Sequence, residues 1–218
     1  MNEQTSEHVS AVAPSGVARL IAHVKAMAPV RTAVVHPCDA LSLGGALDAR
    51  DAGIITPVLV APLAKLRAVA ADFGLDLGDS EIVDVPHSHA AAATAARLAG
   101  KGEVQALMKG SLHSDEYLGA ILAPEACLRT ERRLTHCYIM QTASYPRPFI
   151  ITDAAINIAP TLEIKADIVR NAIDLAHAIG IAEPRVAILA AVETVNPRML
   201  STLDAAALCK MADRGQIA

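Results

Sequence analysis

The feature that most constrains the fold of this chain is a regular alternation of two kinds of segment across residues 17–108. Short apolar runs without strict polar alternation are typical of strands covered on both faces of a sheet. Between them lie segments with helical spacing, and Gly53, Gly74 and Gly100 close three of these. Strands that alternate with helices in this way predict β-α-β units and a parallel sheet.

The same pattern predicts the individual elements and their grouping. Strands are expected at residues 31–36, 57–60, 81–85, 104–108, 134–140, 149–152 and 186–190. Helices are expected at residues 17–27, 40–52, 63–73, 88–99, 112–122, 162–179 and 203–212, with Ser15 and Thr161 as two of the N-caps. The alternation loosens near residues 110–150. We therefore predict an α/β fold with a polar N-terminal tail over residues 1–15, a first α/β lobe over 16–142 and a partial second α/β lobe over 143–218.

The composition excludes several classes of protein. The chain is 53% hydrophobic and 19% charged, which supports a buried core and excludes a disordered chain. Aromatic residues make up only 2%, which argues against modules that bind nucleic acids by base stacking. The formal net charge of -4 provides no basic footprint. We expect no nucleic-acid partner, and any anionic ligand has to be bound by a few placed cations or backbone amides.

The location of the protein is predicted from three further features. No apolar run approaches the length of a membrane span, so no membrane partner is expected. The polar N-terminus has neither the basic nor the apolar region of a secretory signal. The four cysteines are scattered without a C-x-x-C spacing, which is typical of free thiols in a reducing cytoplasm and does not favour a metal site. A cytoplasmic protein is therefore predicted.

The first candidate site follows the strand expected at residues 104–108. Lys109 supplies a positive charge, Gly110 lets the backbone approach a ligand, and Ser111 and His113 offer hydrogen bonds. Ligands of open α/β sheets lie beyond the carboxyl ends of the strands. The alternative is a helix capped by Ser114 with a surface lysine before it.

The second candidate is the arginine-rich segment at residues 128–133. Arg129, Arg132 and Arg133 are able to clamp a phosphate through paired hydrogen bonds. The alternative is a solvated loop in which Glu131 pairs with one of the arginines, and for at least one arginine we favour this alternative.

Two further candidates follow later apolar segments. Asp153 and Asn157 follow the strand expected at residues 149–152, and Glu193, Thr194 and Asn196 follow the strand expected at 186–190. Buried polar groups in such positions need partners, either a ligand or the backbone of a turn. Both interpretations remain open for each set.

Three histidines are weaker candidates. His87 and His89 are metal-ligand types without a third ligand nearby, which favours a role at a helix entry. His36 ends a strand, where a core or turn histidine is the commoner case.

Several of these segments together resemble the phosphate acetyltransferase/phosphate butyryltransferase family. The matching stretches are residues 32–39 (TAVVHPCD), 106–113 (ALMKGSLH), 128–130 (LRT), 149–160 (FIITDAAINIAP), 187–197 (AILAAVETVNP) and 201–217. The resemblance implies two α/β lobes like those of isocitrate/isopropylmalate dehydrogenases, and usually a homodimer. It also implies a reversible reaction in which acyl-CoA and phosphate give acyl phosphate and CoA. CoA and phosphate are substrates of this reaction, and no cofactor is expected.

The resemblance also implies which residues contact the substrates. Lys109, Gly110, Ser111 and His113 fall in one family motif and are expected nearer the phosphate or acyl phosphate. Asp153, Asn157, Glu193, Thr194 and Asn196 fall in the motifs of the second lobe. The family's members are longer, and their Ser-Arg pair and downstream Asp have no counterpart within these 218 residues, so the catalytic residues are unassigned.

Two functional hypotheses therefore remain from the sequence. The first is an acyltransferase that moves a short acyl group between CoA and phosphate. The second is a non-catalytic CoA-binding, phosphate-binding or assembly module derived from the same family. A weaker third hypothesis is a fatty acyl–phosphate acyltransferase that uses acyl carrier protein.

Overall fold

The computed structural model describes residues 16–217. The predicted tail over residues 1–15 lies outside the described residues, and so does Ser15, the predicted N-cap of the helix at residues 17–27. Contacts divide the chain into two compact units. We call Ala22–Glu131 the sheet unit, and the residues up to Ile21 together with those from Arg132 onward the hairpin unit. The predicted lobe boundary after residue 142 falls in the turn of a β-hairpin and remains a prediction.

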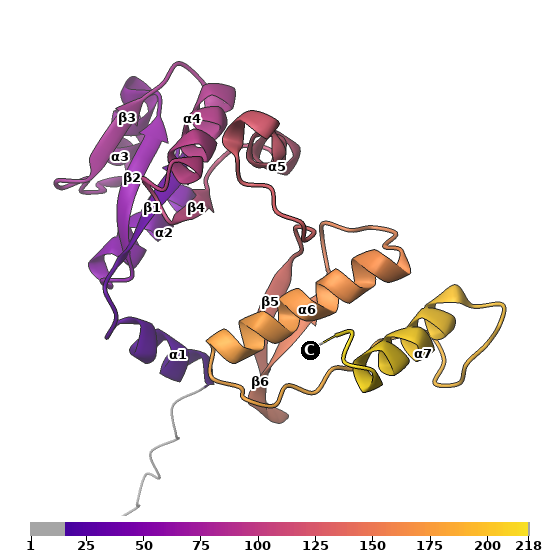
Figure 1. The fold of residues 1–218 in the computed structure, drawn as a ribbon. Helices are drawn as coiled ribbons and strands as arrows, with labels where there is room; N and C mark the ends of the chain where they lie inside the picture. The colour runs from indigo at the N-terminus through magenta and orange to yellow at the C-terminus, as the bar shows by residue number, and fades with distance from the viewer. Residues whose placement is uncertain (1–15, 218) are drawn as a thin grey trace, which may run out of the picture. The chain divides into compact units, whose positions relative to one another are not determined.

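The sheet unit is built on four parallel strands in the order β3-β2-β1-β4 (Figure 1). These strands are β1 (Val30–Val35), β2 (Ile55–Ala61), β3 (Glu81–Asp84) and β4 (Ala106–Lys109). The chain moves outward from β1 to β2 and β3, and then crosses back to place β4 on the other side of β1. The strand order therefore reverses between β1 and β4, where Val35 lies opposite Lys109.

Helices cover both faces of this sheet because neighbouring residues of each buried strand point to opposite sides. On one face, Val34 and Leu59 pack against α2 (Ala40–Asp51) and α3 (Leu63–Phe73). On the other, Val35 and Val58 pack with α4 (Ser88–Gly100), and α5 (Ser114–Leu122) follows β4. Four alanines of α4 are buried, and their small side chains let the helix lie close to the strands: Ala91, Ala92, Ala95 and Ala96. A short 3₁₀ helix, η1 (Pro124–Ala126), completes the unit.

Polar side chains at the carboxyl edge of the sheet begin these helices. Asp39 caps α2 by accepting the Ser42 N–H at 2.7 Å. His87 caps α4 by accepting the Ala90 N–H at its Nδ1, so the helix-entry role predicted for His87 is confirmed. Helix α3 has no cap of its own, and Asp84 from β3 accepts the Leu63 N–H instead, at 2.9 Å.

The hairpin unit contains the antiparallel strands β5 (Cys137–Thr142) and β6 (Tyr145–Thr152). Its helices are α6 (Leu162–Ala178) and α7 (Leu200–Asp213), while α1 (Gly16–Val24) spans the division between the units. Thr161 caps α6 as predicted, because its Oγ1 accepts the Ile164 N–H. The core between α6 and α7 is made by Ala166, Val169, Leu208 and Ile217.

The strand predicted at residues 186–190 is wrong: this segment is irregular. A strand needs the ladder hydrogen bonds of a neighbour, and the only strands of the described hairpin unit, β5 and β6, pair with each other. Without a neighbour two of its large apolar side chains stay exposed, Val186 to 48% and Leu189 to 87%, while Ile188 packs against the core between α6 and α7. Within residues 16–217, no helix combines the length and apolar character needed to cross a membrane.

Candidate functional site

The first candidate residues lie at the reversal of strand order in the sheet unit. In open α/β sheets, ligands bind beyond the carboxyl ends of the strands, at the point where the order reverses. Here that point lies between the ends of β1 and β4. His36, Cys38 and Asp39 follow β1, while Lys109 ends β4 and Gly110 and Ser111 follow it. We call residues 109–111 the 109–111 loop.

The backbone of the 109–111 loop is bonded directly to the end of β1. The Gly110 N–H donates to the Val35 carbonyl oxygen and the Ser111 N–H to that of His36, each at 2.9 Å. A Cβ atom at Gly110 would lie 2.5 Å from the Val35 oxygen and 2.6 Å from the His36 oxygen. Only glycine fits there, because the backbone of residue 110 lies directly against the end of β1.

The Ser111 hydroxyl bridges the same two loops. Its Oγ donates to the His36 carbonyl oxygen at 2.9 Å and accepts the Cys38 N–H at 3.1 Å. Bonding from the Ser42 amide, with a smaller effect from Ser111, lowers the pKa of Asp39. Burial raises the pKa of Cys38, which disfavours its thiolate. Of these two residues, Asp39 therefore carries a charge and Cys38 is neutral.

Lys109 and His113 are the exposed members of the predicted set. The Lys109 ammonium lies 3.3 Å from the Gly110 carbonyl oxygen. His113, rather than Ser114, occupies the N-cap of α5, and its side chain makes no capping hydrogen bond. An exposed ammonium and an exposed imidazole beside the point where the strand order reverses can bind an anionic ligand.

Asp153 and Asn157 form a closed turn after β6. One Asp153 oxygen accepts the N–H groups of Ala155 and Ile156, each at 3.0 Å, and the other accepts the Asn157 amide. Burial raises the pKa of Asp153, but hydrogen bonds from Ile156, Ala155, Asn157 and His136 outweigh this and lower it overall. The turn interpretation of the sequence accounts for these contacts, and a substrate role remains a prediction.

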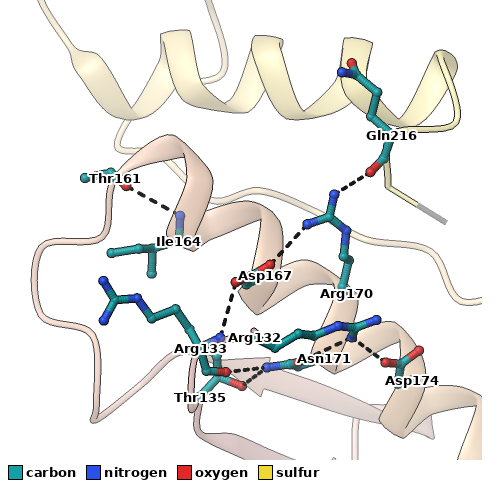
Figure 2. Close-up of polar contacts among 10 residues, drawn as sticks. All are labelled: Arg132, Arg133, Thr135, Thr161, Ile164, Asp167, Arg170, Asn171, Asp174 and Gln216. Carbon is teal, nitrogen blue, oxygen red and sulfur yellow. Dashed lines mark hydrogen bonds and ion pairs between the residues drawn. The ribbon is translucent and has the colours of Figure 1, made fainter. Parts of the chain in front are cut away.

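The arginine-rich segment is held by α6 (Figure 2). Arg132 pairs with Asp174 at 2.6 Å and donates to Asn171 at 3.2 Å, and both partners belong to α6. Asp167 accepts the Arg133 N–H, and Asn171 donates to the Arg133 carbonyl oxygen at 3.0 Å. These contacts use the backbone of Arg133, whose side chain is exposed.

The two residues that follow this segment connect α6 to the Asp153 turn. Asn171 also donates to Thr135 Oγ1 at 3.0 Å, and Asn157 donates to the Leu134 carbonyl oxygen at 3.1 Å. Figure 2 shows Asp167 and Asn171 on one side of α6, facing this segment. The turn is therefore supported by a helix whose own residues were not candidates in the sequence.

The last candidate set lies in the irregular segment before α7. Glu193 and Thr194 are exposed. The Asn196 side chain accepts the Arg198 N–H at 2.9 Å, and its backbone N–H donates to Thr202 Oγ1 at 2.8 Å. Asn196 thus shapes the entry to α7. Among residues 16–217, no group of three or more His, Cys, Asp or Glu side chains is placed to hold a metal ion.

His36 is 7% exposed and its ring is bonded to Ser111, in agreement with the core or turn histidine that the sequence favoured. The structure brings His36, Asp39 and the 109–111 loop together, and separately brings Asp153 to Asn157.

Comparisons with known proteins give a consistent picture. A family described as "Phosphate acetyl/butaryl transferase" matches residues 87–218. The chain is 59% identical over 204 residues, 94% of its length, to a phosphate acetyltransferase of Rhizobium meliloti. It is 39% identical over 91% of its length to a phosphate butyryltransferase of Clostridium acetobutylicum. A branched-chain phosphotransacylase structure from Enterococcus faecalis V583 covers 82% of this chain with TM-score 0.68 and 26% identity.

The matches also define how much of each relative is represented. The chain spans 65% of the Rhizobium meliloti protein and 54% of the phosphate acetyltransferase of Rickettsia felis. It covers 62% of the Enterococcus faecalis structure. A phosphotransacetylase structure from Streptococcus pyogenes, at 14% identity, covers 90% of this chain with TM-score 0.71 and supports the fold alone.

Proposed function

Because the chain belongs to the phosphate acetyl/butyryl transferase family, we propose that it moves a short acyl group between CoA and inorganic phosphate. The observation that carries the proposal is the placement of the 109–111 loop. This loop lies within the family-matched residues 87–218 and at the point of the sheet where the strand order reverses. The names of the relatives supply the reaction: acyl-CoA and phosphate give acyl phosphate and CoA.

The proposed reaction requires charge neutralisation and orientation. A phosphate oxygen attacks the carbonyl carbon of the thioester, the C–O bond forms and the C–S bond breaks. The proton that phosphate gives up ends on the sulfur of CoA. The exposed Lys109 ammonium supplies positive charge beside the phosphate. Holding both reactants in one geometry contributes much of the rate enhancement.

The remaining site residues take their places in this proposal. Gly110, Ser111 and His113 lie beside Lys109 on the phosphate side. The proposed substrate contacts of the hairpin unit are Asp153, Asn157, Glu193, Thr194 and Asn196. Glu193 and Thr194 have exposed side chains available for this, whereas the side chains of Asp153 and Asn157 also bond to each other.

The finer architecture is also part of the proposal. We assign the chain to two lobes like those of isocitrate/isopropylmalate dehydrogenases, a first over residues 16–142 and a partial second over 143–218. The share of the relatives that is represented, 54% to 65%, supports the partial second lobe. We further propose a cytoplasmic homodimer, and the four free cysteines support the reducing compartment.

The experiment is phosphate-dependent release of the CoA thiol from acetyl-CoA and butyryl-CoA by the purified chain. We expect turnover only with phosphate, and the ratio of the two substrates reports acyl-chain preference. Lys109→Ala should lower turnover about tenfold or more. Lys101→Ala, an exposed lysine of the same unit, is the matched control and should leave turnover unchanged.

Absence of turnover by the folded chain would refute catalysis by these residues alone. Calorimetric titration with CoA then tests the second hypothesis, a non-catalytic module that still binds CoA. Binding without turnover would indicate the non-catalytic CoA-binding module, for which the 54% to 65% coverage of the relatives is the favouring observation.

A further inference from the structure

We propose that His36 is a positioning residue that fixes the 109–111 loop through a hydrogen bond to the Ser111 backbone. His36 directly follows β1 and is only 7% exposed. Its Nδ1 lies 3.0 Å from the Ser111 carbonyl oxygen and 3.3 Å from Ser111 Oγ. The effect on acyl transfer rests on the proposed function, whereas the effect on the loop does not.

The hydrogen bond between His36 and Ser111 determines which ring nitrogen of His36 carries the hydrogen. A carbonyl oxygen can only accept a hydrogen bond, so Nδ1 of His36 donates the proton to the Ser111 oxygen. In return, the N–H and the Oγ–H of Ser111 both donate to the His36 carbonyl oxygen. Hydrogen bonds therefore run in both directions between the two residues, and each loop holds the other in place.

The backbone of His36 is a second, independent observation. Its φ of 52° lies in the left-handed region, which only a few per cent of residues other than glycine adopt, histidine more often than most. Such a conformation persists when the surrounding structure determines it, and it is found preferentially at functional sites. Here it occurs at the end of β1, next to the strand that carries Lys109.

The consequence for the reaction is geometric. Lys109 belongs to the loop that His36 holds, and the next residue, Gly110, lies so close to the end of β1 that a Cβ there would meet two carbonyl oxygens. A displacement of a catalytic group by about 1 Å can lower a rate about a hundredfold. His36 thus acts through the loop and contacts no reactant itself.

The test uses variants that keep the backbone conformation of residue 36. His36→Gly accepts a positive φ but removes the donor. His36→Asn also tolerates it, and its side-chain N–H₂ stands in for Nδ1–H. The matched control is Cys127→Gly, because Cys127 of the same unit also has a positive φ, 53°. Hydrogen exchange at the Gly110 and Ser111 amides reports on the loop.

We expect His36→Gly to speed exchange of these amides about tenfold or more, while His36→Asn and Cys127→Gly remain close to the wild type. Where the wild-type chain turns over, kcat/KM for phosphate should fall about tenfold in His36→Gly, mainly through KM, and recover in His36→Asn. A folded His36→Gly with exchange within about twofold of the wild type would overturn the proposal. So would a His36→Asn variant that exchanges as fast as His36→Gly.

Two provisions keep the test decisive. If His36→Gly does not fold, His36→Asp replaces it, because an ionised carboxylate has the shape of Asn but cannot donate. The same outcomes then apply to the Asp and Asn variants. A wild-type chain without turnover would refute the proposed catalysis only, since the exchange measurement needs no substrate.

Discussion

Lys165 on α6 and Asp204 on α7 form the ion pair that joins the two helices of the hairpin unit. Their Nζ and Oδ2 atoms lie 2.6 Å apart, and the side chain of Asp204 is only 10% exposed. The pair lies beside the small apolar core that contains Ala166 and Leu208. Packing and charge pairing therefore both hold α7 to α6.

We expect Asp204→Ala to lower the free energy of unfolding by about 2–3 kcal/mol. Its removal leaves the partly buried Lys165 ammonium without a partner, which is the costly way to break such a pair. Asp213→Ala is the control, since it removes an exposed pair with Lys210 and should cost about 0.5 kcal/mol or less. Urea denaturation measures both, and equal losses would contradict the prediction.

Gly110→Ala should destabilise the chain by about 1–3 kcal/mol, because the new Cβ overlaps two carbonyl oxygens and forces the loop away from β1. Gly119→Ala on α5 is the matched change, with nothing within 4 Å of the new Cβ. It should be neutral or stabilise by up to about 1 kcal/mol, as alanine favours a helix. Thermal denaturation compares the two. A Gly110→Ala variant as stable as Gly119→Ala would disprove the steric argument.

Asp153 should make stability depend on pH in acid. Its hydrogen bonds hold its pKa below the ordinary value of 3.8, against the opposing effect of burial. The folded state thus favours the charged form, so the contribution is complete above the unfolded pKa and is lost as pH falls through the folded one. Asp153→Asn should therefore be less stable than wild type near about pH 7, and the gap should narrow near about pH 3. A gap that widens in acid would reverse the sign.

Tyr117 should ionise at a higher pH than an ordinary tyrosine. Burial raises its pKa to about 12, and its hydroxyl donates to the Leu107 carbonyl oxygen at 3.1 Å. A spectrophotometric titration should show a late step that Tyr117→Phe removes. The same variant should lose about 1 kcal/mol of stability, because the Leu107 oxygen loses a donor. An unchanged titration curve would show that Tyr117 is not the late group.

Much of the sheet unit could be predicted from the sequence because its signals are local. The apolar strands, the helical spacing and the closing Gly74 all lie within one element or next to it, and the predicted helix at residues 63–73 matches α3. The prediction of a strand at residues 186–190 is wrong because an apolar run shows only a tendency to form a strand, and a strand also needs a neighbouring strand to pair with. No local pattern shows whether that partner is present.

The candidate site divides in the same way. The sequence predicts a site at the 109–111 loop from its residue types and its place after a strand, and this stays a prediction. It did not identify His36 as the partner of Ser111, because 75 positions separate them and only the strand order brings them together. Asp153 and Asn157 remained ambiguous because four positions suffice for a turn to satisfy both side chains.

The strand order also determines when the edge between β1 and β4, where the order reverses, can form during synthesis. The strands β1, β2 and β3 are neighbours in both chain and sheet, so they can pair as soon as residues up to Asp84 have emerged. The β1–β4 edge has to wait for a segment made much later, and until then one side of β1 is an open strand edge. A nascent chain from which β3 but not β4 has emerged would thus expose the edge of β1 that later holds the 109–111 loop.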